Sequence, residues 1–276
     1  MENNKTYKVI TIAGSDPSGG AGIQADIKTI TALGGYAASA ITALTIQNTL
    51  GVKGIFPIPD TIVSEQINAI MEDIEPQTIK IGMVKDINIV RCIAKSIQKY
   101  KPQFVVYDPV MISTSGHKLI DDNVIEIIEQ HLIPETSLIT PNLKEAETLL
   151  KREIVTITDM EIAAKQLALK YHIAVLIKGG HLEGNIMCDI LAFPNGNTQH
   201  FTHEKIESKN LHGTGCTLSS AIATFVAQNI VKTHESVSEK AIALAIQQAK
   251  EYVTKAILSG KHRDIGKGHG PLWHLN

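Results

Sequence analysis

The chain has 276 residues, of which 43% are hydrophobic, 20% charged and 4% aromatic, and its formal net charge at pH 7 is −2. This length allows one or two domains with a large buried core. The slightly acidic balance argues against a nucleic-acid-binding protein, which usually has a basic face, and the aromatic content is too low for a surface on which bases stack.

The cysteines and the first residues indicate the compartment. The three cysteines, Cys92, Cys188 and Cys216, are far apart and none lies in a C-x-x-C pair, so we expect neither disulfides nor a cysteine zinc site. Residues 1–8 lack the apolar core of a signal peptide, and no stretch approaches the ~18 apolar residues of a membrane span. We therefore expect a cytoplasmic protein that does not bind membranes.

Short apolar segments separated by longer amphipathic ones predict the strands of a sheet. Most of them are apolar throughout rather than alternating, which is typical of strands that are covered on both faces in a parallel sheet. The predicted strands are Lys8–Ala13, Ala38–Thr45, Thr78–Met83, Phe104–Asp108, Ser137–Thr140, Ala174–Lys178 and Met187–Phe193.

Two capping patterns predict the starts of later helices. Thr158–Glu161 has the spacing of a capping box and predicts a helix that runs to about Tyr171. Ser236–Glu239 has the same spacing and predicts a helix that ends at Gly260. Small and aliphatic residues four apart on this second helix indicate close packing against its neighbours.

The order of these elements predicts the architecture. Strands that alternate with helices indicate βαβ units, and hence an α/β fold with a mostly parallel central sheet. Residues Met187–Phe201, with a turn at Pro194–Gly196, predict an antiparallel hairpin. Since the chain has no repeat, low-complexity tract or linker, we expect a single domain over residues 1–276.

The first glycine-rich segment, Ala13–Asp26, lies between a predicted strand and a predicted helix. P-loop spacing begins at Gly14, but Gly20 and Ala21 stand where a P-loop has Lys and Ser or Thr, so that motif is excluded. A dinucleotide fingerprint fits Gly20–Ala25 but lacks the acidic residue about 20 positions further on. The segment is therefore either a loop that packs closely on a ligand or a turn that only leads into a helix.

The second glycine-rich segment, Leu211–Leu218, precedes a long apolar run that predicts a helix. The amides of Gly213–Cys216 are then free at the helix N-terminus and can face an anion, such as a transferring phosphoryl group. Cys216 lies in this first turn, where the helix dipole lowers a thiol pKa, and a thiolate there can act as a general base. The alternative is a small buried hydrophobic residue, which we expect for Cys92 and Cys188.

The third segment, Thr140–Glu147, has two interpretations. Asn142 and Glu145 have the spacing of a capping box. Glu145 can also face magnesium and nucleotide phosphates at the carboxyl ends of the strands, and periodicity does not separate these roles. Asp108 is a second acidic candidate at that edge, and Lys178, which ends another strand, is either a charge beside the nucleotide or a solvated residue.

Two further candidates depend on their surroundings. Gln47 follows an apolar strand, and its amide either faces a heteroaromatic ring or is satisfied by loop backbone. Met83 taken alone is typical of a core residue. The eleven histidines show no zinc-binding spacing, and only His212 lies in a candidate active segment.

Taken together, these segments resemble the bacterial hydroxymethylpyrimidine/phosphomethylpyrimidine kinases of the ribokinase-like superfamily. The matching motifs follow the family's order and are Ile12–Lys28, Ala43–Thr49, Lys80–Met83, Asp108–Met111, Thr140–Glu147, Lys178–His181, Asn210–Leu218 and Gly268–Pro271. The resemblance implies a three-layer α/β/α fold. It also implies ATP- and magnesium-dependent phosphorylation, in thiamine biosynthesis, of 4-amino-5-hydroxymethyl-2-methylpyrimidine and then of its monophosphate. Members of the family are commonly homodimers.

The resemblance also implies roles for single residues. Those that would contact the pyrimidine or line its pocket are Gly14, Asp26, Gln47, Met83 and Val110. Cys216 stands where most sugar kinases of the superfamily have a catalytic Asp, with anion-hole amides from Gly213 and Gly215. Those of the magnesium, phosphate and nucleotide region are Asp108, Asn142, Glu145, Lys178 and Thr214.

Two other functions compete with this one. A pyridoxal kinase of the same cysteine-containing subgroup also phosphorylates a hydroxymethyl group on a flat heteroaromatic ring, and Gln47 favours the pyrimidine enzyme. A non-catalytic, pyrimidine-binding regulator on a kinase scaffold would be expected to have lost the anion hole or the base, yet both are intact in Gly213–Cys216.

Overall fold

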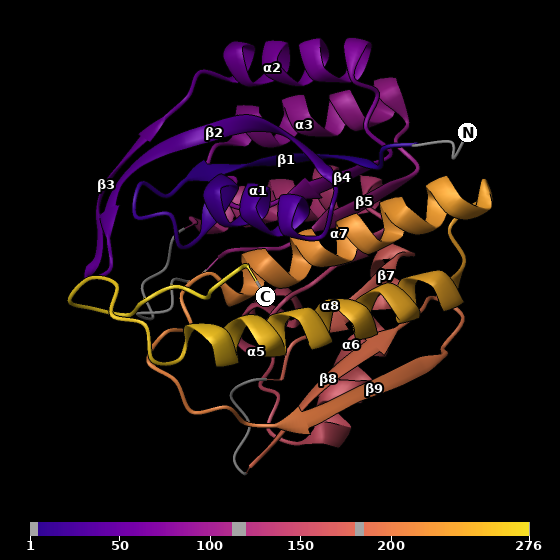
Figure 1. Ribbon diagram of the computed structural model, residues 1–276. Coiled ribbons are helices and arrows are strands. Elements are labelled where there is room, and N and C mark those ends of the chain that lie inside the picture. Colours follow the sequence, from indigo (N-terminus) through magenta and orange to yellow (C-terminus); the bar gives the residue numbers. More distant parts are fainter. Residues whose placement is uncertain (1–4, 112–119, 180–184, 276) are drawn as a thin grey trace.

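The computed structural model describes residues 5–111, 120–179 and 185–275, which fold around a sheet (Figure 1). The strands are β1 (Lys8–Ser15), β2 (Tyr36–Asn48), β3 (Gly51–Pro57), β4 (Thr78–Ile81), β5 (Phe104–Tyr107), β6 (Leu138–Ile139), β7 (Ala174–Ile177), β8 (Ile186–Ala192) and β9 (Thr198–Glu204). Their order in the sheet is β3-β2-β1-β4-β5-β6-β7-β8-β9. The strands from β2 to β7 pair in parallel, β3 pairs antiparallel with β2, and β8 and β9 add antiparallel pairs at the other edge.

Helices cover both faces of this sheet. They are α1 (Gly22–Ala32), α2 (Asp60–Asp73), α3 (Ile87–Tyr100), α4 (Asp122–Ile127), α5 (Leu143–Leu150), α6 (Ile157–Tyr171), α7 (Thr214–Thr233) and α8 (Glu239–Gly260). A π-helical turn (Ile128–Leu132) and a 3₁₀ turn (Ile133–Glu135) follow α4. Residues of α7, α8 and α1 form one core with the sheet, and residues of α2 to α6 form the other (Figure 1). The predicted three-layer α/β/α fold is therefore confirmed. Among the described residues, no helix is long and apolar enough to cross a membrane.

The two cores explain why the central strand β5 is apolar throughout. Successive side chains of a strand point to opposite faces of the sheet. In β5, Phe104 and Val106 pack in the core of α7 and α8, whereas Val105 and Tyr107 pack in the core beneath α2 to α6. Because each face is covered, neither set can be polar. The uniform hydrophobicity of this segment therefore predicts the buried parallel strand that is observed.

The edges of the sheet differ more from the prediction. The hairpin of β8 and β9 is confirmed, with Gly196 in the left-handed region at its turn (φ 89°). The second predicted strand, Ala38–Thr45, is too short, because β2 continues to Asn48 and pairs with the unpredicted β3. β3 is mostly exposed and mixes glycine with charged and apolar residues, so hydrophobic periodicity could not find it. Its hydrogen bonds with β2 keep it in the sheet.

The two predicted helix caps lie at neighbouring residues instead. The capping box that starts α6 is formed by Thr156 and Asp159, not by Thr158. The hydroxyl of Ser238, not Ser236, accepts a hydrogen bond from the amide of Ala241 at the start of α8. Near the start of each helix, more than one Ser or Thr has the position that a cap requires. The path of the chain before the helix decides which of these residues caps it. The capping box of α5 at Asn142 is confirmed.

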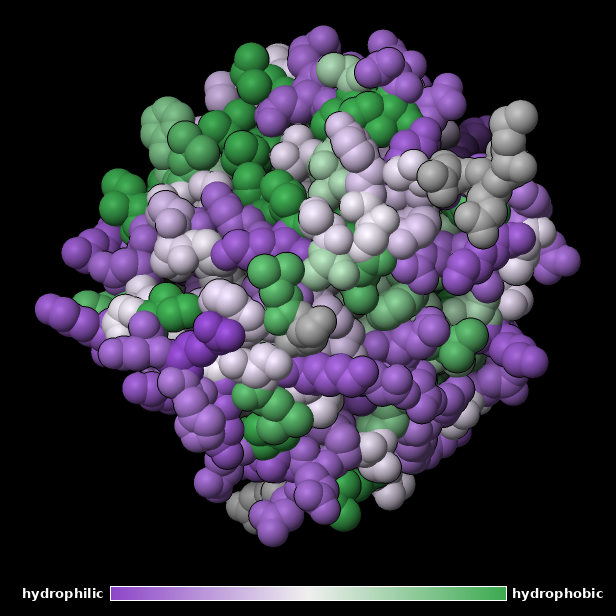
Figure 2. Space-filling view, viewed as in Figure 1, coloured by the Kyte–Doolittle hydropathy of each residue, from purple (hydrophilic) through white to green (hydrophobic). Residues whose placement is uncertain are grey.

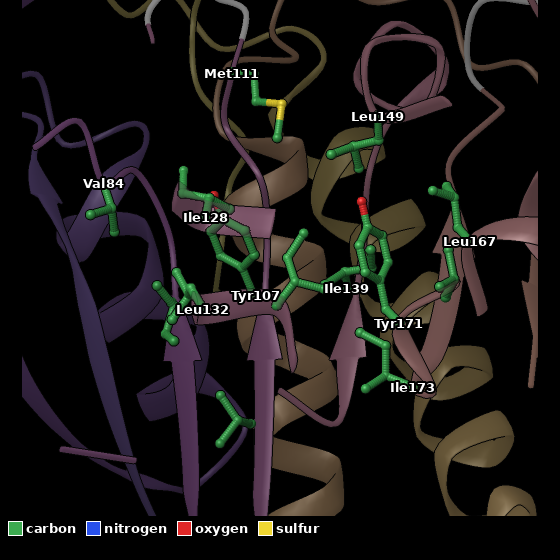
Figure 3. Close-up of a cluster of buried hydrophobic side chains, with 14 of the residues drawn as sticks. Val84, Tyr107, Met111, Ile128, Leu132, Ile139, Leu149, Leu167, Tyr171 and Ile173 are labelled. Atoms are coloured by element: carbon green, nitrogen blue, oxygen red, sulfur yellow. The ribbon is translucent and has the colours of Figure 1, made fainter. Parts of the chain in front are cut away.

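Two buried tyrosines, Tyr107 and Tyr171, lie in the core beneath α2 to α6 (Figure 3). The hydroxyl of Tyr171 donates to Glu129. The hydroxyl of Tyr107 is fully buried and has no hydrogen-bond partner among the described residues. A buried hydroxyl without a partner loses its hydrogen bonds to water and gains nothing in return. Within the part of the chain that the structure describes, Tyr107 is thus a polar group that no partner compensates.

We expect Tyr107→Phe to leave the free energy of unfolding unchanged or to raise it by up to about 2 kcal/mol, because the substitution removes only the unpartnered hydroxyl. Tyr171→Phe is the matched control, and it should lower the free energy by about 1–2 kcal/mol because Glu129 loses a donor. Urea denaturation followed by circular dichroism measures both. Equal losses in the two variants would contradict the assignment.

Candidate active site

Candidates from distant segments meet at the carboxyl edge of the sheet, where the parallel strands face the N-terminus of α7. Gly14 lies in β1, Gln47 in β2, Met83 after β4, Asp108 after β5 and Lys178 after β7. In an open α/β sheet, ligands bind at this edge. The parallel order β2-β1-β4-β5-β6-β7 therefore brings together what the sequence separates by more than a hundred residues.

The start of α7 is seated directly on the first glycine-rich loop. Gly213 is its N-cap and lies in the left-handed region (φ 86°). A β-carbon on Gly213 would lie 1.8 Å from the carbonyl oxygen of Gly20, so only glycine permits this approach. Within the described chain no side chain caps α7; the amide of Thr214 donates to the carbonyl oxygen of Leu211, and the amides of Gly215 and Cys216 are left for an anion. This loop is therefore part of the site and not only a turn into α1.

The first turn of α7 also faces a charged pair. A β-carbon on Gly215 would lie 3.3 Å from both Oδ2 of Asp108 and Nζ of Lys178. The hydroxyl and the backbone amide of Thr214 both donate to the carbonyl oxygen of Leu211, at 2.7 and 3.3 Å, so Thr214 holds the turn that precedes α7. The amides and a lysine thus point at one region from two sides.

Asp16 organises the loop below this turn. Its Oδ1 accepts hydrogen bonds from the amide and hydroxyl of Ser18, and its Oδ2 accepts from the amides of Gly20 and Ala21 and lies 2.8 Å from Nε2 of His212. Burial opposes ionisation, but these donors lower the pKa of Asp16 to about 2. The ionised carboxylate therefore joins the glycine-rich loop to the segment that precedes α7.

A buried ion pair lies beneath the site. Nζ of Lys80 lies 2.9 and 2.8 Å from the two carboxylate oxygens of Asp26, and neither residue has any exposed surface. Thr11 and Ser220 also donate to this carboxylate, at 2.5 and 2.7 Å. Because Asp26 is fully enclosed and its oxygens already have these donors, the expected contact of Asp26 with the substrate is not supported. We correct its role to holding Lys80 beneath the site.

Cys216 is partly exposed in the first turn of α7, above this ion pair. Burial raises the pKa of its thiol to about 11, although Lys80 and the amide of Gly22 act in the opposite direction. The carboxylates of Asp26 and Asp108 add to the increase. The expectation that the pKa of this thiol is lowered is therefore wrong, because desolvation by burial and two nearby carboxylates raise it.

Asp108 and Lys178 form a second ion pair at the edge of the sheet. Nζ of Lys178 lies 2.7 Å from Oδ1 of Asp108, which also accepts from the hydroxyl of Thr140 at 3.0 Å. Burial opposes ionisation of Asp108, but Lys178 and then Lys80 hold its pKa below the usual range. The side chain of Lys178 keeps 17% of its surface exposed, which leaves the ammonium group accessible to an incoming anion.

Glu145 acts as a cap and as a buried acid at once. It forms a capping box with Asn142: the carboxylate accepts from the Asn142 amide at 2.8 Å, and the Asn142 side chain accepts from the Glu145 amide at 3.0 Å. Only 3% of Glu145 is exposed, and burial raises its pKa to about 7 despite the charge of Lys178. The carboxyl of an exposed capping residue would not have its pKa raised by burial. The capping role is thus confirmed, and a metal-facing role remains compatible with it.

The expected pocket residues lie around the loop and the strand ends. A β-carbon on Gly14 would lie 2.7 Å from Cε of Met83, so the two residues are in contact. Gln47 is half-buried and lies 3.2 Å from the His212 ring. Val110 is half-buried two residues after Asp108. Of the motif Lys178–His181, Gly180 and His181 lie outside the described residues.

Three residues of the candidate site lie in motifs that the sequence singles out, but the sequence assigned them no role of their own. They are Lys80, Asp16 and His212. A signal existed for Lys80, because a lysine within a short apolar strand must find a buried anion. Asp16 and His212 carry no such pattern, since only the docking of α7 on the loop brings them together.

A sequence model of the family described as phosphomethylpyrimidine kinase matches residues 16–273. The thiamine biosynthesis bifunctional protein ThiED of Geobacter sulfurreducens is 42% identical over 267 residues, which are 97% of this chain but only 52% of that protein. The hydroxymethylpyrimidine/phosphomethylpyrimidine kinase of Salmonella typhimurium is 41% identical over 269 residues, 97% of each chain. The chain thus spans about half of the bifunctional relative and nearly all of the other.

Solved structures agree with this similarity. The crystal structure of phosphomethylpyrimidine kinase from Clostridium difficile 630 has a TM-score of 0.78 and 40% identity, covering 91% of this chain and 100% of that one. An ADP complex of Bacillus subtilis pyridoxal kinase has a TM-score of 0.85 and 32% identity, covering 98% of each chain. The fold is therefore shared by both kinds of kinase, while the sequence is nearer to the pyrimidine kinases.

The buried pair of Lys80 and Asp26 gives a prediction about stability. Lys80→Met should lower the free energy of unfolding by about 3–5 kcal/mol, because Asp26 is then a buried charge without its counterion. The double variant Lys80→Met/Asp26→Leu should recover most of this loss. Lys99→Met is the control, since Lys99 and Glu72 are 56% and 60% exposed, and its effect should stay below about 1 kcal/mol. A double variant no more stable than Lys80→Met, in urea denaturation, would contradict this.

Proposed function

The chain belongs to the phosphomethylpyrimidine kinase family, and from this membership we propose how its site works. It is a kinase of thiamine biosynthesis, which phosphorylates 4-amino-5-hydroxymethyl-2-methylpyrimidine and then the resulting monophosphate, with ATP as the donor. One observation carries the proposed mechanism. The uncapped N-terminus of α7, the thiol of Cys216 and the pair of Asp108 and Lys178 lie together at the carboxyl edge of the sheet.

In the first transfer, the hydroxymethyl oxygen attacks the γ-phosphorus of ATP, the bond from that phosphorus to the β,γ-bridging oxygen breaks, and ADP leaves. The hydroxyl proton must leave the attacking oxygen. Negative charge is spread over the γ-phosphoryl oxygens, and in this proposal the amides of Gly213, Gly215 and Cys216 stabilise it. Lys178 supplies a fixed positive charge beside them.

We assign the departing proton to Cys216. With a pKa of about 11, the thiol keeps its proton at neutral pH, so the thiolate that accepts a proton is a minor form. Lys80 and the amide of Gly22 favour that form. A loose transition state needs the base only late, when the attacking oxygen has begun to bond to phosphorus and has become acidic. A weakly populated base therefore suffices for this chemistry.

Mg²⁺ would be held by the carboxylates of Asp108 and Glu145 together with the phosphates of ATP. The donors fit this ion, since Mg²⁺ prefers oxygen ligands and usually binds through one or two carboxylates plus substrate phosphates. Oδ2 of Asp108 faces the first turn of α7, while Oδ1 is held by Lys178 and Thr140. When bound, the ion would neutralise charge on the transferring phosphates.

The second transfer places different demands on the site. The acceptor is now a phosphate oxygen, which is already ionised to a large extent at neutral pH and needs little help from a base. The electrostatic parts of the site, Lys178 and the α7 amides, remain necessary because the charge to be neutralised is larger. The two steps should therefore depend on Cys216 to different degrees.

We expect Cys216→Ala to lower kcat/KM of the first step by about 10²- to 10⁴-fold and that of the second step far less. Cys216→Asp should keep more of the first step than Cys216→Ala, since a carboxylate restores a base. For the wild type, the first step should rise between about pH 7 and 9 as more thiolate forms, because the folded pKa lies above this range. ADP release measured with each pyrimidine and Mg²⁺–ATP checks these results.

Equal losses in both steps for Cys216→Ala would contradict the division of roles. A Cys216→Ser variant as active as the wild type in the first step would show that the thiol only positions the hydroxyl. The same assay with pyridoxal addresses the rival function, since a kcat/KM for pyridoxal equal to that for the pyrimidine would favour a pyridoxal kinase. Ligand binding without ADP release from any substrate would favour a regulator.

We further propose that the chain is a cytoplasmic homodimer. Its three cysteines are free thiols, which fits a reducing compartment. A large apolar patch supports the dimer: Leu44 and Ile46 of β2 are 44% and 65% exposed, and Phe56 of β3, which pairs with Leu44, is 64% exposed. Figure 2 shows hydrophobic residues gathered over the edge where β2 and β3 lie. A second copy would bury this patch.

We expect Ile46→Lys and Phe56→Lys to shift the protein from dimer to monomer in size-exclusion chromatography with light scattering. A charge in the middle of an apolar interface is desolvated without a partner. Ile186→Lys is the control, since Ile186 is similarly exposed (62%) but lies on β8, near the opposite edge of the sheet. A wild type that is monomeric at micromolar concentration would exclude the proposal.

A further inference from the structure

The side-chain amide of Gln47 lies between two partners whose chemistry decides its orientation. Its Nε2 lies 3.2 Å from Nε2 of His212, and its Oε1 lies 3.3 Å from Oγ1 of Thr45. The nitrogen and oxygen of an amide exchange places on a half-turn about the last torsion, and the shape of the group hardly changes. The hydrogen-bonding partners must therefore decide which atom faces which neighbour.

The first partner requires an acceptor. Oδ2 of Asp16 lies 2.8 Å from Nε2 of His212 and also accepts from two backbone amides, so it is an ionised acceptor. Nε2 of His212 must then carry a hydrogen, in either the neutral or the charged ring. The ring also lies beside Gly20, where a β-carbon would lie 2.5 Å from Cδ2 of His212. An N–H of Gln47 facing Nε2 of His212 would set two donors against each other.

The second partner requires a donor. Oγ1 of Thr45 lies 2.8 Å from the carbonyl oxygen of Ser15, which can only accept, so the single hydroxyl hydrogen of Thr45 points there. The remaining lone pairs of Oγ1 can accept a hydrogen bond but cannot donate one. An oxygen of Gln47 facing Thr45 would therefore set two acceptors against each other. Both conflicts disappear together when the amide is turned by half a revolution.

We propose that His212, held by Asp16, is a specificity-determining positioning residue that fixes the Gln47 amide with its oxygen toward His212 and its nitrogen toward Thr45. Every hydrogen in the network then meets an acceptor. Thr45 donates to Ser15, Gln47 donates to Thr45, and the single Nε2–H of His212 is shared between Asp16 at 2.8 Å and the Gln47 oxygen at 3.2 Å. His212 thus acts through Gln47.

The orientation matters for the substrate, and this step rests on the proposed function. The fixed amide retains one acceptor lone pair on its His212 side and one N–H on its Thr45 side. A 4-aminopyrimidine presents the complementary pair on one edge, a donor at the amino group and an acceptor at the adjacent ring nitrogen, N3. The 4-oxo analogue reverses both, with an N3–H donor and a carbonyl acceptor. A Gln47 amide with a fixed orientation therefore binds the 4-aminopyrimidine and disfavours the 4-oxo analogue. A Gln47 amide that can rotate would fit either compound.

The first test is direct and needs no substitution. In the wild-type protein labelled with ¹⁵N, nuclear Overhauser contacts of the Gln47 side-chain NH₂ show its neighbours. We expect contacts with the methyl group of Thr45. Contacts of this NH₂ with the His212 ring protons would overturn the proposal. The test does not depend on catalysis, so it remains decisive even if the proposed function fails.

The second test compares 4-amino-5-hydroxymethyl-2-methylpyrimidine with its 4-oxo analogue. For the wild type we expect a ratio of kcat/KM of at least about 100 in favour of the amino compound. His212→Phe keeps a ring in the packed position but has no hydrogen-bond donor. In this variant the ratio of kcat/KM for the amino compound to that for the 4-oxo compound should fall to about 10 or less. The change should appear mainly in KM, since His212 does not touch the reacting atoms. His212→Lys, which has donors and no acceptor, should keep a ratio above that of His212→Phe.

His269→Phe is the matched control. His269 is an exposed histidine of the C-terminal segment, whose backbone amide donates to the carbonyl oxygen of Thr49 just after β2, and its ring should leave the ratio unchanged. If His212→Phe lowers kcat/KM for both compounds by the same factor, His212 only supports the fold and the proposal is refuted. Absence of ADP release from the wild type with either compound would contradict the proposed function instead.

Discussion

The buried ion pair between Lys80 and Asp26 is the interaction on which the site depends. A lysine with no exposed surface in the central strand β4 is costly unless an anion meets it. Asp26 of α1 supplies that anion, and Thr11 of β1 and Ser220 of α7 donate to the same carboxylate. Two strands and two helices are thereby joined at one point directly beneath Cys216. The first turn of α7 is therefore placed by a charge interaction as well as by packing.

From this pair, charges of alternating sign continue along the carboxyl edge of the sheet. Asp26 is followed by Lys80, then Asp108, Lys178 and Glu145. Each lysine holds a carboxylate on either side, which keeps both ammonium groups charged despite their burial. Burial, with the carboxylates of Asp26 and Asp108, raises the pKa of the Cys216 thiol. The arrangement is thus better suited to holding phosphates and metal than to keeping Cys216 as a thiolate.

Strand β2 serves two purposes because its side chains alternate. Beyond the body of the sheet, one face carries Thr45 and Gln47 toward the glycine-rich loop and His212, and the other carries exposed Leu44 and Ile46. Packing of a second copy on the apolar face would therefore steady the strand that presents Gln47. The proposed dimer and the proposed specificity of the site are linked through this single strand.

The amino-acid sequence by itself determined the fold class, the buried strands and the segments that form the site. It could do so because hydrophobic runs such as Phe104–Asp108, a capping box such as Asn142–Glu145 and glycines such as Gly213 act over a few residues. Only the tertiary structure decided that β3 joins the sheet, that Asp26 is enclosed by Lys80, that burial raises the pKa of Cys216, and that His212 meets Asp16. These outcomes depend on desolvation and on contacts between residues far apart in the chain, such as the 196 positions that separate Asp16 from His212, and no local pattern encodes either.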